Sequence, residues 1–268
     1  MYKIGLSSCG KTLNRQLFAD YAKAGIDAME VSPAWDVYKY LDYKAIKKYA
    51  DEFGITLWSY HLPFQTIDLS TEDKAWSVCT TEYLSELIKQ ASDIGINKFV
   101  AHPSSGAFPP EERERKLACS KESLNELAEI AAKFNSEICV EVLPRQCLGN
   151  CSDEILDILS VNDKLRVCFD TNHLLKEDAL LFLGRVGDKI ATLHVSDYDF
   201  EDERHWLPGE GDVDWNRLYQ GIVDTGYQGV WMYELGFERS DRKKALTCKD
   251  FVENAKEIFA GKAVTLRR

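Results

Sequence analysis

The sequence has no long apolar run and no excess of positive charge. No apolar stretch reaches about 18 residues, the length that a membrane-spanning helix needs, so we expect no membrane span. Lys and Arg number 33 against 44 Asp and Glu, which gives a formal net charge of -11. A nucleic-acid surface needs clustered Lys and Arg, so this balance argues against a nucleic-acid partner.

The chain also lacks the features of an exported protein. Its first ten residues, MYKIGLSSCG, enter a strand at once and lack the layout of a signal peptide. It has eight cysteines, but a chain of this length can build its core without disulfides. Cys139 and Cys168 lie in apolar strand runs, whereas Cys147 and Cys151 have no second pair nearby to complete a zinc site. We therefore predict free thiols, a reducing compartment and a cytoplasmic location.

No linker or low-complexity stretch interrupts the chain, so we expect one domain over residues 1–268. What the chain does contain is a repeated pattern: a helix end, a glycine, a short turn, then an apolar strand that closes on a polar residue. The pattern occurs in AGIDAMEVS, FGITLWSYH, IGINKFVAH and TGYQGVWMYE. Gly25, Gly54, Gly95 and Gly226 fit the left-handed residue just past a helix. Such βα repeats indicate parallel strands with right-handed crossovers.

The pattern predicts eight short strands that are apolar on both faces, as buried parallel strands are. They are Tyr2–Ser7, Ala28–Ser32, Thr56–His61, Lys98–His102, Ile138–Leu143, Leu165–Asp170, Ile190–Val195 and Val230–Glu234. Helices are expected over Tyr43–Phe53, Ala75–Ile94, a segment that starts at Pro110, a segment that Ser152 caps, Asp214–Thr225 and Arg242–Phe259. Eight such units favour a single (β/α)8 TIM barrel of the α/β class, and an open doubly wound sheet is the alternative.

In a barrel, the carboxyl ends of the strands meet at one face, and there the sequence places ionisable residues. These strand ends carry Ser7, Ser32, His61, His102, Glu141, Asp170 with His173, His194, and Glu234. The chain has five histidines, and the fifth, His205, follows His194 in the next loop. A single histidine is more often a hydrogen-bonded structural residue. Five at one rim indicate a bound ligand, because unsatisfied polar groups on an apolar barrel are costly.

We predict one divalent metal ion held by Glu141, Asp170, His194 and Glu234, from four neighbouring strands. Three carboxylates and one imidazole suit Mn, Mg or Co, and also Zn, and leave positions open for substrate. For Glu234 the alternative is a surface carboxylate paired with an arginine, although it follows the apolar run Val-Trp-Met-Tyr.

Seven short motifs in order resemble those of the sugar phosphate isomerase/epimerase superfamily. This superfamily has a xylose isomerase-like TIM barrel and includes AP endonuclease family 2. The motifs are HLPF at 61–64, AHPS at 101–104, EVLPR at 141–145, DTNH at 170–173, HVSD at 194–197, ERHWLPGEG at 203–211 and YEL at 233–235. Together they span nearly the whole chain.

The resemblance implies a metal-dependent isomerase or epimerase that acts on a small carbohydrate by proton transfer through a metal-stabilised enediolate. Glu141 and Glu234 match residues that act as acid and base on opposite faces of the substrate carbon. One face used twice would give isomerisation instead. We expect substrate binding by His173, His205, Arg145, His61 and His102. Dimers or tetramers are common among relatives, so a homo-oligomer stays open.

Some positions depart from the epimerase pattern. Cys147 stands where the EVLNR run of the epimerases usually continues to a Glu, and His205 lies near a position where they carry an Arg. The change at Cys147 puts ketohexose specificity in doubt. Trp35, Phe64 and Trp206 are loop aromatics that could wall a sugar ring or pack as a lid.

Three other functions stay open. An endonuclease IV-type enzyme binds three metals through positions that match His61, His102, Glu141, Asp170, His173, His194, His205 and Glu234, with Glu203 in place of an Asp. The charge balance of this chain ranks that function second. A dehydratase of keto-inositols would share the proton-abstraction step. A non-enzymatic binding barrel is poorly motivated with so many polar strand ends.

Overall fold

The computed structural model describes residues 1–238, 244–262 and 264. In these residues, eight parallel strands form one sheet in the order β7-β6-β5-β4-β3-β2-β1-β8. They are β1 Lys3–Ser7, β2 Ala28–Val31, β3 Thr56–His61, β4 Lys98–Ala101, β5 Glu137–Glu141, β6 Arg166–Asp170, β7 Ile190–His194 and β8 Val230–Tyr233.

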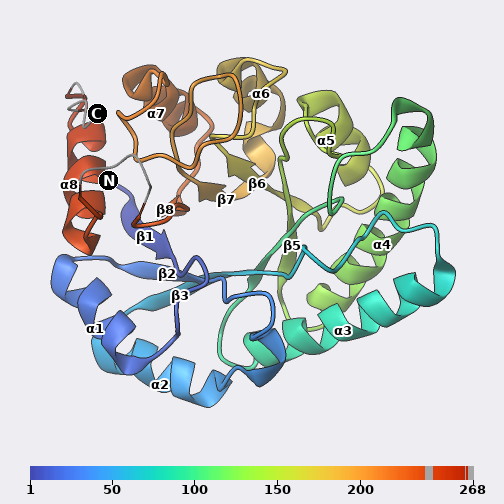
Figure 1. Ribbon diagram of the computed structural model, residues 1–268, viewed down its shortest axis with the longest axis horizontal. Helices are drawn as coiled ribbons and strands as arrows, with labels where there is room; N and C mark the ends of the chain where they lie inside the picture. The colour runs from blue at the N-terminus through green and yellow to red at the C-terminus, as the bar shows by residue number, and fades with distance from the viewer. Residues whose placement is uncertain (239–243, 263, 265–268) are drawn as a thin grey trace.

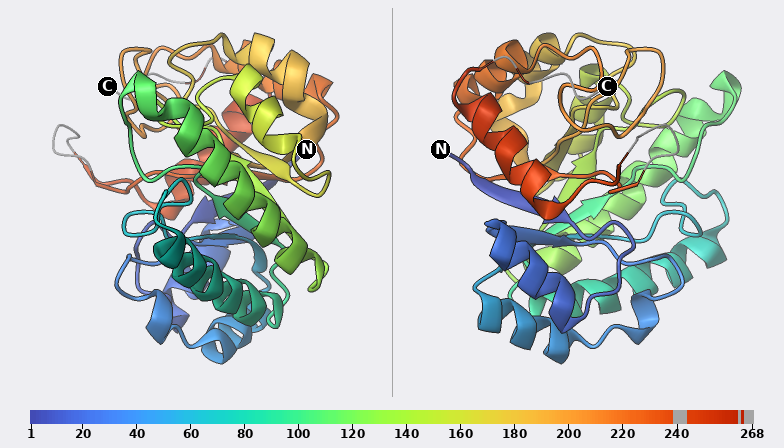
Figure 2. Two further views of the ribbon diagram at one scale, coloured as in Figure 1. Left: turned by 90° about the vertical axis from the view of Figure 1, so that its right-hand side faces the viewer. Right: turned by 60° about the vertical axis from the view of Figure 1, so that its left-hand side comes forward.

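The sheet is nearly closed between β7 and β8, the two strands at the ends of this order. The Val195 amide donates to the Met232 carbonyl at 2.8 Å, and the Glu234 amide donates to the Val195 carbonyl at 3.2 Å. These bonds join the carboxyl ends of β7 and β8. Figures 1 and 2 show the helices arranged around the strands. The predicted (β/α)8 TIM barrel is therefore confirmed, and the open doubly wound sheet is excluded.

The helices lie between the strands, as expected. They are α1 Arg15–Ala24, α2 Tyr43–Phe53, α3 Lys74–Ser92, α4 Arg113–Ala132, α5 Ser152–Leu159, α6 Ala179–Val186, α7 Trp215–Asp224 and α8 Cys248–Phe259. Short 3-10 turns cover η1 Tyr38–Tyr40, η2 Pro110–Glu112 and η3 Gly187–Lys189. The sequence analysis named no bounds for α1 and α6. None of the described helices combines the length and the apolar character that crossing a bilayer requires.

Three predicted helix starts were wrong. Residues Pro110–Glu112 form a 3-10 turn, so α4 begins at Arg113 and not at Pro110. The last helix, predicted to start at Arg242, begins at Cys248 because Thr247 and Asp250 form a reciprocal capping box. Arg242 itself lies outside the described residues. Ser152 is the first residue of α5 and not its cap. Its amide instead donates to the Glu177 carboxylate at 2.7 Å.

The apolar core lies mainly between the barrel and the helices, where one large cluster of buried residues joins all eight units. A smaller cluster fills the barrel interior with Val100, Cys139 and Cys168, so the prediction that these two cysteines are core residues is confirmed. All eight cysteines are free thiols. The predicted left-handed glycines also occur, with φ of 91° at Gly25 and 80° at Gly226.

Candidate metal centre

Four of the strand ends bring their side chains to one point above the barrel interior. Glu141, Asp170 and His194 are the last residues of β5, β6 and β7, and Glu234 follows β8 directly. One ligand atom from each of the four lies within 4.8 Å of the other three. The His194 Nδ1 atom lies 3.2 Å from Glu234 Oε2, 3.3 Å from Glu141 Oε1 and 3.8 Å from Asp170 Oδ2.

These four side chains are largely buried, but not all of their polar atoms form hydrogen bonds. Glu141, Asp170 and His194 are at most 1% exposed, and the Glu234 side chain is 16% exposed. Asp170 Oδ2 is buried and accepts no hydrogen bond from the part of the chain that the structure describes. Three buried carboxylates around one imidazole repel one another unless a cation lies between them. The donor set and the orphaned oxygen therefore fit a hard divalent ion.

The pKa values in this group reflect the competition between burial and charge. Burial raises the pKa of Asp170 to about 6, with Glu234 and Glu141 adding to the effect and His173 opposing it. Burial would also raise the pKa of Glu141, but His102 and His194 hold it well below its ordinary value. Burial would lower the pKa of His173, but Asp170 and Glu203 raise it to about 10. Imidazolium charge thus balances the carboxylates where no cation does so.

Each of four histidines has one ring nitrogen close to an oxygen that can fix the orientation of the ring. Nδ1 of His61 lies 2.9 Å from the Leu62 carbonyl, and Nδ1 of His173 lies 2.8 Å from the Val142 carbonyl. Nδ1 of His205 lies 3.3 Å from the Glu234 carbonyl. His194 is turned the other way, with Nε2 3.0 Å from Glu30 Oε2. Metal-binding histidines are oriented in this way, because the bonded N–H fixes the ring and its tautomer.

Two further donor groups flank the central one. His61, His102 and Glu141 form the first, with the two Nε2 atoms 3.2 Å and 2.9 Å from Glu141 Oε2. His173, Glu203 and His205 form the second, with His173 Nε2 3.4 Å from Glu203 Oε2. The structure thus brings together all five histidines that the sequence analysis assigned to the rim.

The loop that follows β7 carries Glu203 and His205, and buried polar residues fix its path. The Asp197 carboxylate accepts hydrogen bonds from five donors: the backbone amides of Tyr198, Gly209, Gly211 and Val213, and the Trp215 indole. The Asn172 side-chain oxygen accepts from the amides of Arg204 and His205 at 2.7 and 3.2 Å. The HVSD, DTNH and PGEG motifs therefore share one structural task, which is to hold this loop over the strand ends.

Glu30 is a buried site residue that the sequence analysis missed. It lies in β2, is fully buried, and its Oε2 atom contacts both His194 Nε2 at 3.0 Å and the Ser59 hydroxyl at 2.8 Å. The signal in the sequence was a single charged residue inside the apolar strand Ala28–Val31. A carboxylate behind a metal-binding imidazole orients the ring and makes it a stronger ligand.

Three other residues named in the sequence analysis, Arg145, Phe64 and Trp206, have different surroundings. Arg145, which was expected to bind substrate, lies at the rim and is paired with Asp202 at 2.8 Å and Glu203 at 2.7 Å. The Phe64 ring stacks on His102, with their centroids 4.0 Å apart. The Trp206 backbone exchanges two hydrogen bonds with the Asp197 backbone, and these bonds help to hold the loop after β7 in place.

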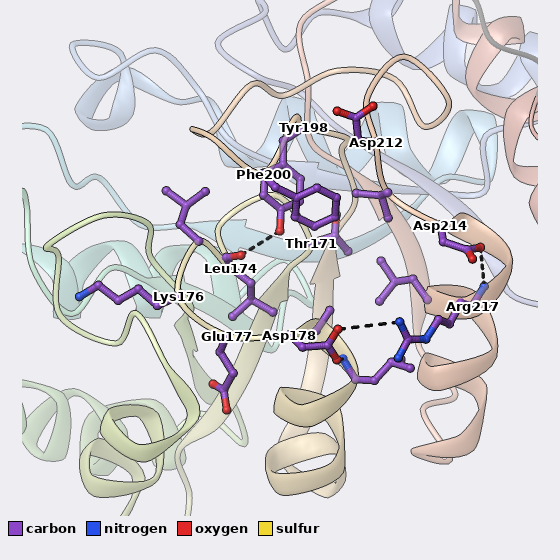
Figure 3. Close-up of a pocket in the computed structure, with 15 residues that line it drawn as sticks. Thr171, Leu174, Lys176, Glu177, Asp178, Tyr198, Phe200, Asp212, Asp214 and Arg217 are labelled. Atoms are coloured by element: carbon purple, nitrogen blue, oxygen red, sulfur yellow. Dashed lines mark hydrogen bonds and ion pairs between the residues drawn. The ribbon is translucent and has the colours of Figure 1, made fainter.

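A pocket of about 340 Å³ opens over the donor groups. Its lining includes His61, His102, Glu141, Arg145, His173, Glu203, His205 and Glu234. Another hollow of about 530 Å³ lies outside the barrel, at the N-termini of α6 and α7 (Figure 3). Its carboxylates Asp178 and Asp214 already accept hydrogen bonds from the first turns of their own helices. The pocket over the strand ends, in contrast, is lined by the carboxylates and imidazoles of the donor groups.

Comparison with known proteins places this geometry in a family. The profile of the xylose isomerase-like TIM barrel matches residues 18–253. The chain belongs to this family. The resemblance drawn from the seven motifs is thus confirmed.

Within the xylose isomerase-like TIM barrel family, the chain is similar to both sugar epimerases and a nuclease. It is 25% identical over 231 residues to the D-psicose 3-epimerase of Agrobacterium fabrum (strain C58 / ATCC 33970), which covers 80% of this chain and 76% of that one. It is 27% identical over 190 residues to the probable endonuclease 4 of Acholeplasma laidlawii (strain PG-8A), 63% and 64% of the two chains. The crystal structure of a D-tagatose 3-epimerase-like protein superposes with a TM-score of 0.80 at 21% identity, over 96% of this chain and 97% of that one. That structure supports the fold alone.

Proposed function

We propose that the chain is a divalent-metal-dependent isomerase or epimerase that moves a proton at a sugar carbon next to a carbonyl. The observation that carries this proposal is the convergence of Glu141, Asp170, His194 and Glu234 beneath a pocket of about 340 Å³. Mn, Mg, Co and Zn all suit three carboxylates and one imidazole. The similarity to a D-psicose 3-epimerase supports a carbohydrate substrate.

The chemistry divides between the ion and the carboxylates. A bound divalent cation supplies positive charge that stabilises the negative charge formed when the carbon loses its proton. Glu234 would take that proton, because it lies in the pocket lining, and it is ionised because His194 holds its pKa low against the effect of burial. Glu141, whose ligand atom lies within 4.8 Å of that of Glu234, would be the partner that returns a proton. Two carboxylates on two faces give epimerisation.

The histidines around the pocket are suited to hold the sugar. His173 keeps a raised pKa of about 10, and the pKa of His61 is raised to about 9 by Glu141, Glu30 and Glu234 against the opposing effect of burial. Each would donate hydrogen bonds from Nε2 to sugar oxygens. Arg145 would have to leave Asp202 and Glu203 to reach a substrate.

The two flanking groups support a second candidate function, a phosphodiesterase that uses several metals. His61, His102 and Glu141 could hold one further ion, and His173, Glu203 and His205 another. The similarity to a probable endonuclease 4 points the same way. Charge disfavours this candidate: Arg145 and Arg204 near the site are both paired with acidic residues, and the net charge is -11.

The test is solvent-deuterium exchange over a panel of ketoses, aldoses and keto-inositols with the manganese-loaded protein. We expect deuterium to enter one carbon of at least one sugar in the wild type and not in Glu234→Gln. A keto-inositol that exchanges and then loses water would identify the dehydratase. No exchange on any compound, together with nicking of an abasic DNA duplex, would overturn the proposal in favour of the phosphodiesterase.

A further inference from the structure

The pocket over the donor groups continues into a second, larger compartment of different chemistry. This apolar compartment measures about 550 Å³ and lies beyond the ends of β1, β2, β3 and β8. It shares three wall residues with the first pocket: Phe64, His205 and Glu234. The two hollows therefore adjoin, with these three residues at their common border.

The walls of the apolar compartment differ from those of the first pocket. They include Pro33, Ala34, Trp35, Tyr38 and Pro63. The Tyr38 hydroxyl is already used, since it donates to the His61 carbonyl at 2.8 Å. Such walls offer apolar surface but few hydrogen bonds, so they suit a flat or aliphatic group better than a second sugar ring.

Trp35 supplies the observation that points to a ligand. It is 59% exposed, although a lid aromatic packed onto the protein would be largely buried. The indole instead forms part of the wall of the apolar compartment, in a loop directly after β2. An exposed indole beside an active-site pocket gains most when a ligand covers it.

We propose that the substrate is a sugar conjugate with an aryl or alkyl substituent. Its sugar lies in the pocket over the donor groups, and its substituent lies in the apolar compartment against Trp35. The placement of the sugar rests on the proposed function. The preference for an apolar substituent rests on the walls of the apolar compartment alone.

The experiment compares methyl and benzyl β-glycosides of 3-keto-glucose, 3-keto-galactose and 3-keto-xylose, which keep a carbonyl in the sugar ring, by calorimetric titration of the manganese-loaded full chain. We expect at least one sugar whose benzyl glycoside binds about tenfold to a hundredfold more tightly than its methyl glycoside. That benzyl glycoside should also bind with a more negative heat-capacity change, because it buries apolar surface. The benzyl-to-methyl ratio should fall to about threefold or less in Trp35→Ala.

Trp76→Ala is the matched control, because Trp76 is also exposed, at 51%, but lies on α3. It should keep the wild-type ratio. Equal binding of the two glycosides, no binding of either, or a ratio that Trp35→Ala leaves unchanged would each overturn the inference. The ratio needs no turnover, so failure of the proposed function would show separately, as absent deuterium exchange beside an intact benzyl preference.

Discussion

The role of Glu30 gives a sharp test of the metal centre, because a single change removes its charge and little else. Glu30 Oε2 contacts His194 and Ser59, while its other oxygen, Oε1, is buried and accepts no hydrogen bond from the described residues. In Glu30→Gln the amide oxygen can replace Oε2 and keep both contacts. The variant therefore isolates the negative charge behind the imidazole.

The expected magnitude follows from the type of hydrogen bond that changes. A bond to a charged group contributes about 1.5–3 kcal/mol, whereas a neutral one contributes about 1 kcal/mol. The difference of about 0.5–2 kcal/mol corresponds to about twofold to thirtyfold in the manganese dissociation constant of Glu30→Gln, which overlaps the range of about 10- to 100-fold seen for carboxylates behind metal-bound histidines. The metal-free variant should be less stable than the wild type, because the His194 imidazole loses a buried charged partner.

The assay is calorimetric titration of metal-free protein with manganese, beside urea unfolding of the metal-free forms. Glu137→Gln is the matched control: Glu137 starts β5 at the opposite end of the barrel and pairs with Lys98 and Arg166. It should leave manganese binding unchanged. If Glu30→Gln binds manganese as the wild type does, while Glu234→Gln binds it more weakly, the ring of His194 does not depend on Glu30 and our reasoning fails.

Four more outcomes are expected. Glu234→Gln should lower deuterium exchange by about 10²- to 10⁴-fold in isotope-tracing assays; wild-type exchange would remove Glu234 from the acid/base role. Asp197→Ala should lower the free energy of unfolding in urea by about 3 kcal/mol or more, since five donors lose their acceptor; a loss under about 1 kcal/mol would contradict this. Because burial raises the pKa of Asp170 to about 6, the bound ion must displace a proton below that pH. Manganese affinity should therefore fall as pH drops from about 7 to 5, and calorimetry in two buffers should detect the released protons; constant affinity would refute it. Elemental analysis of the purified protein should give about one divalent ion per chain, and about three zinc ions would favour the phosphodiesterase.

The sequence predicted the barrel and the rim because both depend on local patterns. Short apolar strands that end in a polar residue repeat eight times, and in a parallel barrel those ends must share one face. The bounds of α2 followed directly from its apolar stripe and its final glycine. The start of α8 did not, because it depends on one reciprocal pair of hydrogen bonds between Thr247 and Asp250.

The missed features depend on contacts between distant segments. Glu30 carries no motif of its own, and its importance arises only where β2 brings it beneath His194, 164 positions away. The distance between His173 and Glu203 depends on the whole path of the loop after β7, which Asp197 fixes through donors up to 18 residues away. No periodicity in the sequence encodes such a path.

The histidines that face Glu141 connect the number of bound ions to the function. The Nε2 atoms of His61 and His102 lie 3.2 and 2.9 Å from Glu141 Oε2, and an unprotonated nitrogen so close to a carboxylate oxygen is repulsive. Either a proton or a second cation must lie between these groups. With one ion at the central group, His61 would keep its proton and could donate a hydrogen bond to a sugar hydroxyl, as the proposed function expects. With further ions, the same nitrogens bind metal and lose that capacity, while the added positive charge suits a phosphodiester. The occupancy of the flanking groups therefore decides between the two functions, because the same imidazoles cannot bind both metal and sugar through Nε2.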